Sequence, residues 1–137
     1  MSAGGRVLCL AGAVAALAVL VTGWRLMPDA RGVGTHQQLG LAACGWLAAT
    51  GYPCPTCGMT TAVSLASHGR WGASLAAQPM GLPLAMVLAT AFWPLMLSAA
   101  TGSRVAVVLP RLFSARILWV VLALMLAAWA YKAWALR

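Results

Sequence analysis

The residues best suited to chemistry in this chain are cysteines, and two of them are separated by only two residues. Cys54 and Cys57 flank Pro55 and Thr56, and Gly58 follows directly. This spacing brings two sulfur atoms close enough to share a metal ion or to form a small disulfide ring, and Gly58 permits a tight turn after the second cysteine. The motif therefore has three interpretations: a metal site, a redox pair, or a structural turn holding a plain disulfide or two free thiols.

A metal ion at this turn needs further ligands, because structural zinc usually binds four. Cys44 lies ten residues before Cys54, and the only imidazoles are His36 and His68. The metal interpretation predicts that zinc or another thiophilic metal binds Cys44, Cys54, Cys57 and His36, or that a dimer supplies four cysteines from two copies of the turn. His68 is expected to point toward the turn only from a distance.

The redox interpretation needs no further ligand. Cys54 would be the attacking thiolate and Cys57 its partner, with Cys44 as a resolving or shuttle thiol. The chain lacks the βαβ pattern of thioredoxin-like proteins, so only membrane helices could carry such a pair. The alternative function is therefore a membrane thiol–disulfide oxidoreductase that uses Cys54 and Cys57.

The composition excludes several other functions. Hydrophobic residues make up 63% of the 137 residues and charged residues only 7%, and Asp29 is the one acid. A single carboxylate excludes acid–base pairs of carboxylates and leaves too few ligands for Ca²⁺ or Mg²⁺. The nine Lys and Arg residues are scattered between apolar runs, which suits lipid headgroups and argues against a nucleic-acid partner.

The elements that must position the cysteines are helices in a bilayer. We predict an all-α, polytopic membrane protein with three spanning helices and a short interfacial or re-entrant helical hairpin that carries the cysteine turn. The expected order is helix 7–24; a polar loop, a short apolar helix (39–49) and the cysteine turn over 25–56; short helices over 57–78; helix 79–101; a basic loop over 102–115; and helix 116–135.

Several side chains in these segments carry expectations of their own. Residues 7–24 also resemble a secretory signal, but the apolar run continues past the Ala16–Ala18 triplet to Trp24, which favours a retained helix. Pro83 and Pro94 are expected to bend the second span. Lys132 is expected to reach toward the headgroups. Three hydroxyls after the cysteine turn are expected to pack or to bond the backbone one turn back: Thr60, Thr61 and Ser64.

The distribution of positive charge gives an orientation. Arg104, Arg111 and Arg116 form the densest basic group, and such groups favour the cytoplasmic side. The N-terminus is then cytoplasmic and the cysteine turn lies on the outer side.

Cys44 and residues 50–62 (Thr-Gly-Tyr-Pro-Cys-Pro-Thr-Cys-Gly-Met-Thr-Thr-Ala) resemble the membrane family catalogued as domain of unknown function 2752. The resemblance extends over about half of the chain, from residue 34 to 97. It implies a short, multi-span protein of the bacterial inner membrane and gives no activity. Two positions depart from the family pattern: Thr61 stands where many members have Arg, and Gln78 stands where they have Asn.

The sequence thus favours a non-enzymatic role, as an accessory or structural membrane subunit with a cysteine-based metal or disulfide site. Its expected partners are the lipid bilayer and either other membrane subunits or a second copy in a homodimer. Transport through so few spans would need an oligomer.

Overall fold

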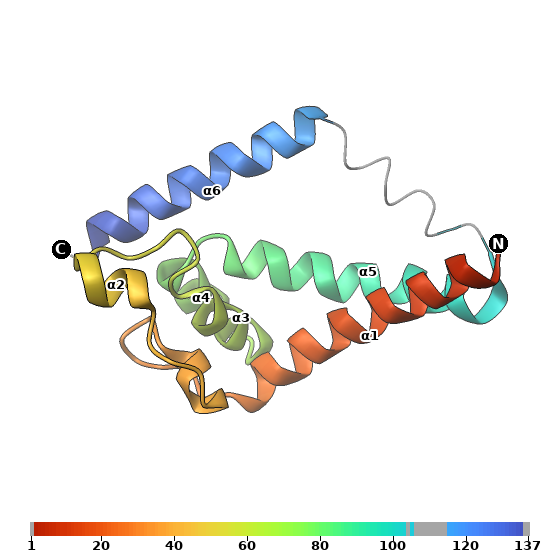
Figure 1. Ribbon diagram of the computed structural model, residues 1–137, viewed down its shortest axis with the longest axis horizontal. Helices are drawn as coiled ribbons and strands as arrows, with labels where there is room; N and C mark the ends of the chain where they lie inside the picture. The colour runs from red at the N-terminus through yellow and green to blue at the C-terminus, as the bar shows by residue number, and fades with distance from the viewer. Residues whose placement is uncertain (1, 104, 106–114, 136–137) are drawn as a thin grey trace.

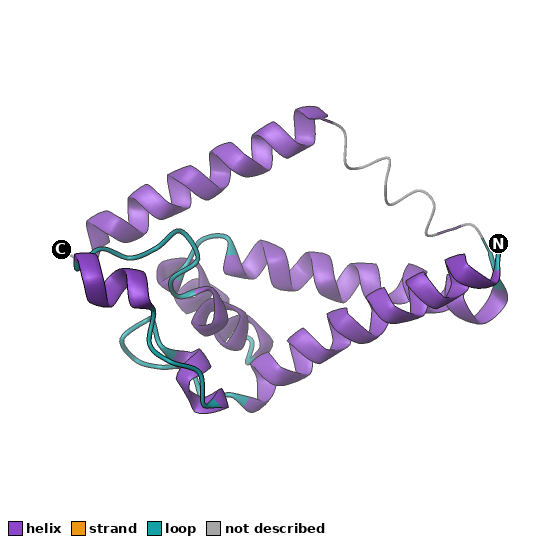
Figure 2. Ribbon diagram, viewed as in Figure 1, coloured by secondary structure: helices purple, strands orange, loops and turns teal. Residues whose placement is uncertain are grey.

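The computed structural model describes residues 2–103, 105 and 115–135, and within this part of the chain the regular structure is helical (Figure 1, Figure 2). The basic group at Arg104 and Arg111 and the C-terminal Arg137 lie outside the described residues. The elements are α1 (Ala3–Arg25), the 3₁₀ helix η1 (Thr35–Leu39), α2 (Gly45–Thr50), α3 (Met59–Ser67), α4 (Trp71–Ala77), α5 (Gly81–Thr101) and α6 (Ala115–Ala135).

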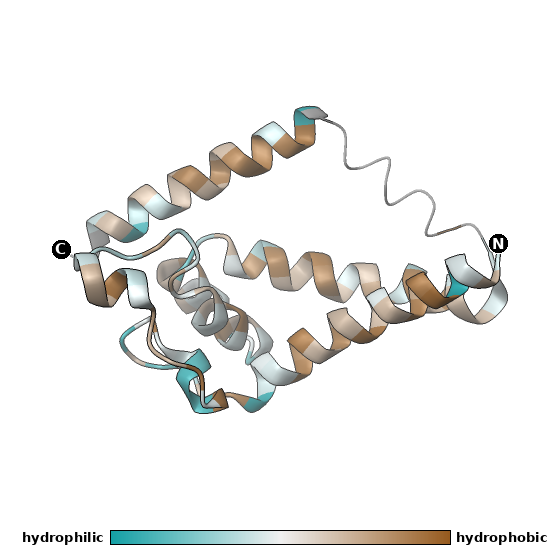
Figure 3. Ribbon diagram, in the orientation of Figure 1, coloured by the Kyte–Doolittle hydropathy of each residue, from teal (hydrophilic) through white to brown (hydrophobic). Residues whose placement is uncertain are grey.

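Three of these helices are long and apolar enough to cross a membrane: α1, α5 and α6. Their apolar stretches of 19 to 23 residues in total length match the ~20 residues that a bilayer core requires. Few of their residues are buried inside the protein, and the brown of apolar residues runs along each of these ribbons (Figure 3). Lipid is the solvent that such surfaces fit, so the prediction of an all-α membrane protein with three spans is confirmed.

The short helices gather at one end of the molecule. In Figure 1, α1 and α5 run side by side in opposite directions, and α2, α3 and α4 lie where α1 ends and α5 begins. Helix α6 stands apart along most of its length and reaches this same end with its C-terminus. The N-terminus lies at the opposite end, so the protein has one structured end, which carries the cysteines.

The helix expected over residues 39–49 is much shorter in the structure. The chain forms η1 over Thr35–Leu39, stops at Gly40 and becomes helical again only in α2. Gly40 has φ of +77°, a left-handed conformation that ends the 3₁₀ turn. The apolar run of residues 39–49 is therefore interrupted, and none of the residues of α2 is buried.

Lys132 does not reach outward, contrary to the sequence-based expectation. It is only 4% exposed, and its Nζ donates to the carbonyls of Ala77 (2.6 Å) and Gly32 (3.1 Å). Ala77 is the last residue of α4, and the final carbonyls of a helix lack partners and carry partial negative charge. These carbonyls attract the ammonium inward and fix the end of α6 to the rest of the protein.

The hydroxyls after the cysteine turn also differ from expectation, because they bond between elements. Thr61 Oγ1 lies 2.7 Å from Thr35 Oγ1, and Ser64 Oγ donates to the Leu26 carbonyl at 2.7 Å. On α4, Ser74 Oγ donates to the Ala62 carbonyl at 2.7 Å. Thr35, Thr61, Ser64 and Ser74 are fully buried. Buried polar bonds therefore join α3 to α4 and to the segment after α1.

Proline affects only part of α5. Pro94 lies inside the helix, where the missing N–H removes a backbone bond. Pro83 is the third residue of α5, in the first turn, where an N–H would lack an intrahelical partner anyway. The bend expected at these prolines stays a prediction.

A close glycine contact holds α5 against α3. A Cβ on Gly81 would overlap the Cβ of Ala62 and crowd its backbone. We expect Gly81→Ala to lower the free energy of unfolding by about 1–3 kcal/mol, the usual cost of overpacking. Thermal unfolding in detergent measures the effect, with Gly72→Ala as the control because nothing lies near a Cβ there. Equal stability of the two variants would contradict the close packing of α3 and α5.

Candidate metal centre

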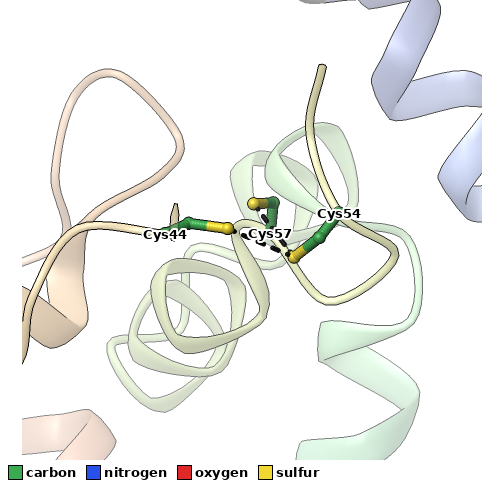
Figure 4. A group of neighbouring side chains, drawn as sticks. All are labelled: Cys44, Cys54 and Cys57. Carbon is green, nitrogen blue, oxygen red and sulfur yellow. Dashed lines mark hydrogen bonds between the residues drawn. The ribbon is translucent and has the colours of Figure 1, made fainter. Parts of the chain in front are cut away.

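Three of the four cysteines meet at the structured end of the protein. Cys54 Sγ lies 3.2 Å from Cys57 Sγ and 3.6 Å from Cys44 Sγ, and all three sulfurs lie within 4.8 Å of one another (Figure 4). Cys57 is buried, Cys44 and Cys54 are partly exposed, and all four cysteines of the chain are free thiols. The structure therefore brings together the three cysteines that the sequence singled out, which we call the cysteine cluster.

Two segments of chain deliver these sulfurs. Cys44 is the residue immediately before α2, while Cys54 and Cys57 belong to a turn that leads into α3. Within the turn the Cys57 amide donates to the Cys54 carbonyl, and the Met59 amide donates to the Thr56 carbonyl, each at 3.0 Å. These bonds fold the backbone tightly enough to place both sulfurs on one side.

Gly58 is required at the end of this turn for two reasons. Its φ is +87°, which strains any residue that has a Cβ. A Cβ would also lie 2.6 Å from the Gly32 carbonyl oxygen and 3.2 Å from Lys132 Nζ. The backbone beside Cys57 thus packs directly against the contact that fixes the end of α6.

Carbonyls on both sides of Cys54 anchor the turn to distant parts of the chain. The Pro53 carbonyl accepts a bond from Trp129 Nε1 at 2.8 Å, and the Pro55 carbonyl accepts one from Gln78 Nε2 at 2.9 Å. Pro53 and Gln78 are fully buried. Gln78 therefore holds the cysteine turn in place, and α6 holds it from the other side through Trp129.

The surroundings shift the pKa values of two thiols in opposite directions. Burial raises the pKa of Cys54, but hydrogen bonds from Thr56, Cys57 and Cys44 outweigh it and lower that pKa to about 7. Burial is also the largest influence on Cys57, and together with its contacts to Cys54 and Cys44 it raises the pKa to about 12. Near pH 7 Cys54 is therefore about half in its thiolate form, while Cys57 stays protonated.

The cluster has the dimensions of a thiolate metal site. Three sulfurs bound tetrahedrally at a Zn–S distance of about 2.3 Å would lie roughly 3.8 Å apart. The observed separations, from 3.2 Å up to the 4.8 Å limit, bracket that value. Positive charge lies nearby, because Lys132 Nζ approaches Gly58, the residue after Cys57. A set of thiolates with a divalent ion is net negative, so this cation favours it.

The two histidines and Cys9 occupy different places. His36 Nε2 lies 3.1 Å from the Ala42 carbonyl oxygen, and the ring is not among the groups gathered at the cysteine cluster. His68 follows α3, where its Nδ1 lies 2.8 Å from the Ser64 carbonyl oxygen. Cys9 lies in α1, away from the other three cysteines, and is partly exposed.

A cavity of about 240 Å³ opens beside the cluster. Its lining includes Cys44, Cys57, His36 and Arg31, together with apolar side chains. His36 thus shares a cavity wall with two of the cysteines, although it does not join their cluster. This space gives an ion or a small molecule access to the sulfurs.

Sequence reasoning missed the residues that support the cluster from α6. Trp129 and Lys132 lie more than 70 residues beyond the cysteine turn, so no spacing rule connects them with it. One signal was present, because a lone ionisable residue inside an apolar span usually faces a partner in the protein. Lys132 satisfies that rule.

Comparison with known proteins gives a family and no activity. Neither the curated proteins nor the solved structures include a significant match to this chain. Residues 44–92, about a third of the chain, match the model of a family described as protein of unknown function (DUF2752). This segment runs from Cys44 through the whole cysteine turn into α5. The resemblance seen in the sequence is thereby confirmed, and over this segment the chain carries the pattern of the DUF2752 family.

Proposed function

We propose that this protein is an accessory membrane subunit that binds a thiophilic metal ion, zinc or Cu(I), through Cys44, Cys54 and Cys57. The observation that carries the proposal is the convergence of three sulfurs from two separate segments to within 4.8 Å of one another. A two-cysteine disulfide has no need of the third sulfur. Soft thiolate ligands select zinc and Cu(I) over Ca²⁺ or Mg²⁺.

His36 is the proposed fourth ligand. Metal-binding histidines usually donate their second ring N–H to a carbonyl or carboxylate, which orients the ring. The contact between His36 Nε2 and the Ala42 carbonyl oxygen supplies such a partner and leaves Nδ1 for the metal. Binding would require His36 and Ala42 to move together toward Cys44 and Cys57, across the cavity that His36 shares with these cysteines. With Cu(I), three thiolates suffice and His36 stays where it is.

Elemental analysis tests this proposal. The full chain, purified under reducing conditions and loaded with zinc or Cu(I), is expected to retain about one ion per cluster. Cys57→Ser should lose the ion, because Cys57 is the buried ligand of the cluster. Cys9→Ser is the matched control and should keep it, since Cys9 lies in α1 away from the cluster. Wild-type protein without bound metal under these conditions would refute the proposal.

A second candidate function, thiol–disulfide exchange, is favoured by the opposite pKa shifts of Cys54 and Cys57. The Cys54 thiolate would attack a partner's disulfide and release one partner thiolate. Cys57, on losing its proton, would then attack the mixed disulfide and release the second. Two electrons and the one proton of Cys57 pass to the partner, whose second thiolate takes its proton from water, and Cys54 and Cys57 become a disulfide.

The pH dependence of alkylation tests the thiolate at Cys54. Its thiol deprotonates as the pH rises through the pKa of about 7, so iodoacetamide should label Cys54 half-maximally near pH 7. Cys57 should stay unlabelled until strongly alkaline pH. Peptide mass spectrometry on metal-free protein assigns each label. Labelling of Cys54 only above pH 8.5, as expected for an ordinary thiol, would remove the basis for this function.

A trapping experiment separates the two functions. If the chain exchanges disulfides, the double variant Cys44→Ser/Cys57→Ala should accumulate a mixed disulfide through Cys54, because both thiols that could resolve it are gone. If the cluster is a metal site alone, the same variant should lose metal and trap nothing. Non-reducing electrophoresis of membranes followed by mass spectrometry reads both outcomes.

We further propose that the protein resides in the bacterial inner membrane with the cysteine turn on the outer side. The turn and the N-terminus lie at opposite ends of the molecule (Figure 1). This fits the single span, α1, that separates them along the chain. The exposed apolar face of α6 supports contact with lipid, with another membrane subunit or with a second copy. A membrane-impermeant maleimide should label the turn in intact cells, and labelling only after lysis would reverse the orientation.

A further inference from the structure

A second cavity, of about 400 Å³, lies at the same end of the protein and is lined by positive charge. It is formed by the segment after α1, by α3 and α4 and by the end of α6. Its charged lining residues are Asp29, Arg31, Arg70 and Lys132, and its apolar lining includes Leu65, Ala73 and Ala76. We call this space the basic cavity. It is distinct from the cavity beside His36, although Arg31 contributes to both.

The basic cavity holds more positive charge than its one carboxylate can neutralise. Arg31 pairs with Asp29, with Nη2 2.7 Å from Oδ2, and Arg31 Nε donates to the same carboxylate. Asp29 is the only acidic residue of the sequence, so no other carboxylate side chain is available to Arg70 or Lys132. Arg70 and Lys132 therefore face one space without a carboxylate partner.

Lys132 makes this space a built site rather than an exposed basic patch. Its side chain is 96% buried, and its ammonium donates to the Gly32 and Ala77 carbonyls, which belong to residues that line the cavity. An ammonium has three N–H donors, and these carbonyls take two of them. The protein has thus fixed a charge at the wall of the cavity, in a position where an anion is its natural partner.

The position of the cavity relative to the ends of the spanning helices indicates the kind of anion that it binds. Helix α1 ends at Arg25, just before the segment that lines the cavity, and Lys132 lies within three residues of the end of α6. The cavity is therefore at the height where two spans leave the hydrocarbon. Its combination of cations with Leu65, Ala73 and Ala76 matches a molecule that carries a phosphate above an acyl chain.

We propose that the basic cavity binds the phosphate of an anionic phospholipid headgroup, with Arg70 and Lys132 as its positive contacts. The Asp29–Arg31 pair forms the neutral part of the wall. Bound lipid would contact Gly32 and Ala77. The carbonyls of these two residues, together with Lys132, surround Gly58, so the lipid would stabilise the contact between the end of α6 and the cysteine turn.

Native mass spectrometry of the delipidated full chain in a non-ionic detergent tests the proposal. Titration with phosphatidylglycerol should give a one-to-one adduct, while phosphatidylcholine should bind much more weakly. Arg70→Gln should weaken phosphatidylglycerol binding by about fivefold to tenfold, the value of one cation near a lipid phosphate. Arg25→Gln is the matched control. Arg25 is also exposed and is the last residue of α1, at the same end of the protein as Arg70, but it does not line the cavity.

Three results would overturn the proposal. One is equal binding of phosphatidylglycerol and phosphatidylcholine. Another is equal weakening by Arg70→Gln and Arg25→Gln. The third is an adduct with inorganic phosphate that excludes phosphatidylglycerol, which would assign the cavity to a free anion. Arg70 is exposed, so its replacement should leave the fold intact, and Lys132→Met then serves as a second, stronger variant.

Discussion

Replacing Cys44 with serine is expected to lower the affinity for zinc by about a hundredfold or more. Loss of a partner that only supports a metal ligand already costs about 10- to 100-fold, and Cys44 is proposed as a direct ligand. Its Sγ lies 3.6 Å from Cys54 Sγ, yet it comes from a different segment of chain, before α2. Competition with a chromophoric zinc chelator measures the change in affinity.

The same variant separates metal binding from disulfide chemistry. Cys44→Ser leaves Cys54 and Cys57 in place, 3.2 Å apart, so mild oxidation should still join them in a disulfide. Thiol counting before and after oxidation checks that the turn is intact. Cys9→Ser should change neither property, because Cys9 is outside the cluster. Unchanged zinc affinity in Cys44→Ser would remove the three-cysteine site and leave only the pair.

Replacing Gly58 with alanine is expected to destabilise the protein by about 2–5 kcal/mol and to abolish metal binding. A left-handed backbone costs an alanine about 1–2 kcal/mol, and an overpacked contact adds about 1–3 kcal/mol. Here the new Cβ would press on the Gly32 carbonyl and on Lys132 Nζ. The turn must shift to relieve that contact, and Cys57 shifts with it.

Gly51→Ala is the control that isolates the close contact from the backbone strain. Gly51 has φ of +72°, comparable with Gly58, but nothing lies near its Cβ position. It should therefore lose only about 1–2 kcal/mol and keep its metal. Thermal unfolding in detergent and metal content are measured for both variants. Equal behaviour of the two would mean that the packing of Gly58 against the end of α6 does not position the cluster.

The spans and the cysteine cluster were predictable because each leaves a local signal. Three runs of about 20 apolar residues require helices in a bilayer, whatever surrounds them. A single turn sets the positions of Cys54 and Cys57 relative to each other, and Gly58 indicates that turn in the sequence. Cys44 was a candidate by chemistry alone, since no periodicity relates it to the turn, and the structure confirms its proximity.

The framework that holds the cluster was not predictable, because it depends on contacts across long stretches of chain. Ser64 and Thr61 were expected to pack or to bond the backbone one turn back, but they reach Leu26 and Thr35. Lys132 was expected to reach lipid headgroups, but two backbone carbonyls hold it inside. In each case a polar group bonds a carbonyl or hydroxyl that is distant in the sequence and comes close only when the chain folds.

These polar bonds supplement a small apolar core at the structured end, formed by Ala62, Leu65 and Ala77. The residues of α3 and α4 there are mainly small, so apolar burial offers little stabilisation. Buried hydrogen bonds contribute about 0.5–1.5 kcal/mol each and about 1.5–3 kcal/mol when one partner is charged. They also have fixed directions, which suits a turn that must keep three sulfurs at a common point.

X-ray absorption spectroscopy of the zinc-loaded protein tests the central claim most directly. The spectrum should show about three sulfur atoms at about 2.3 Å, from Cys44, Cys54 and Cys57, and one lighter ligand at about 2.0–2.1 Å. A shell of oxygen and nitrogen atoms with no sulfur, or with two sulfurs only, would contradict a three-cysteine metal centre.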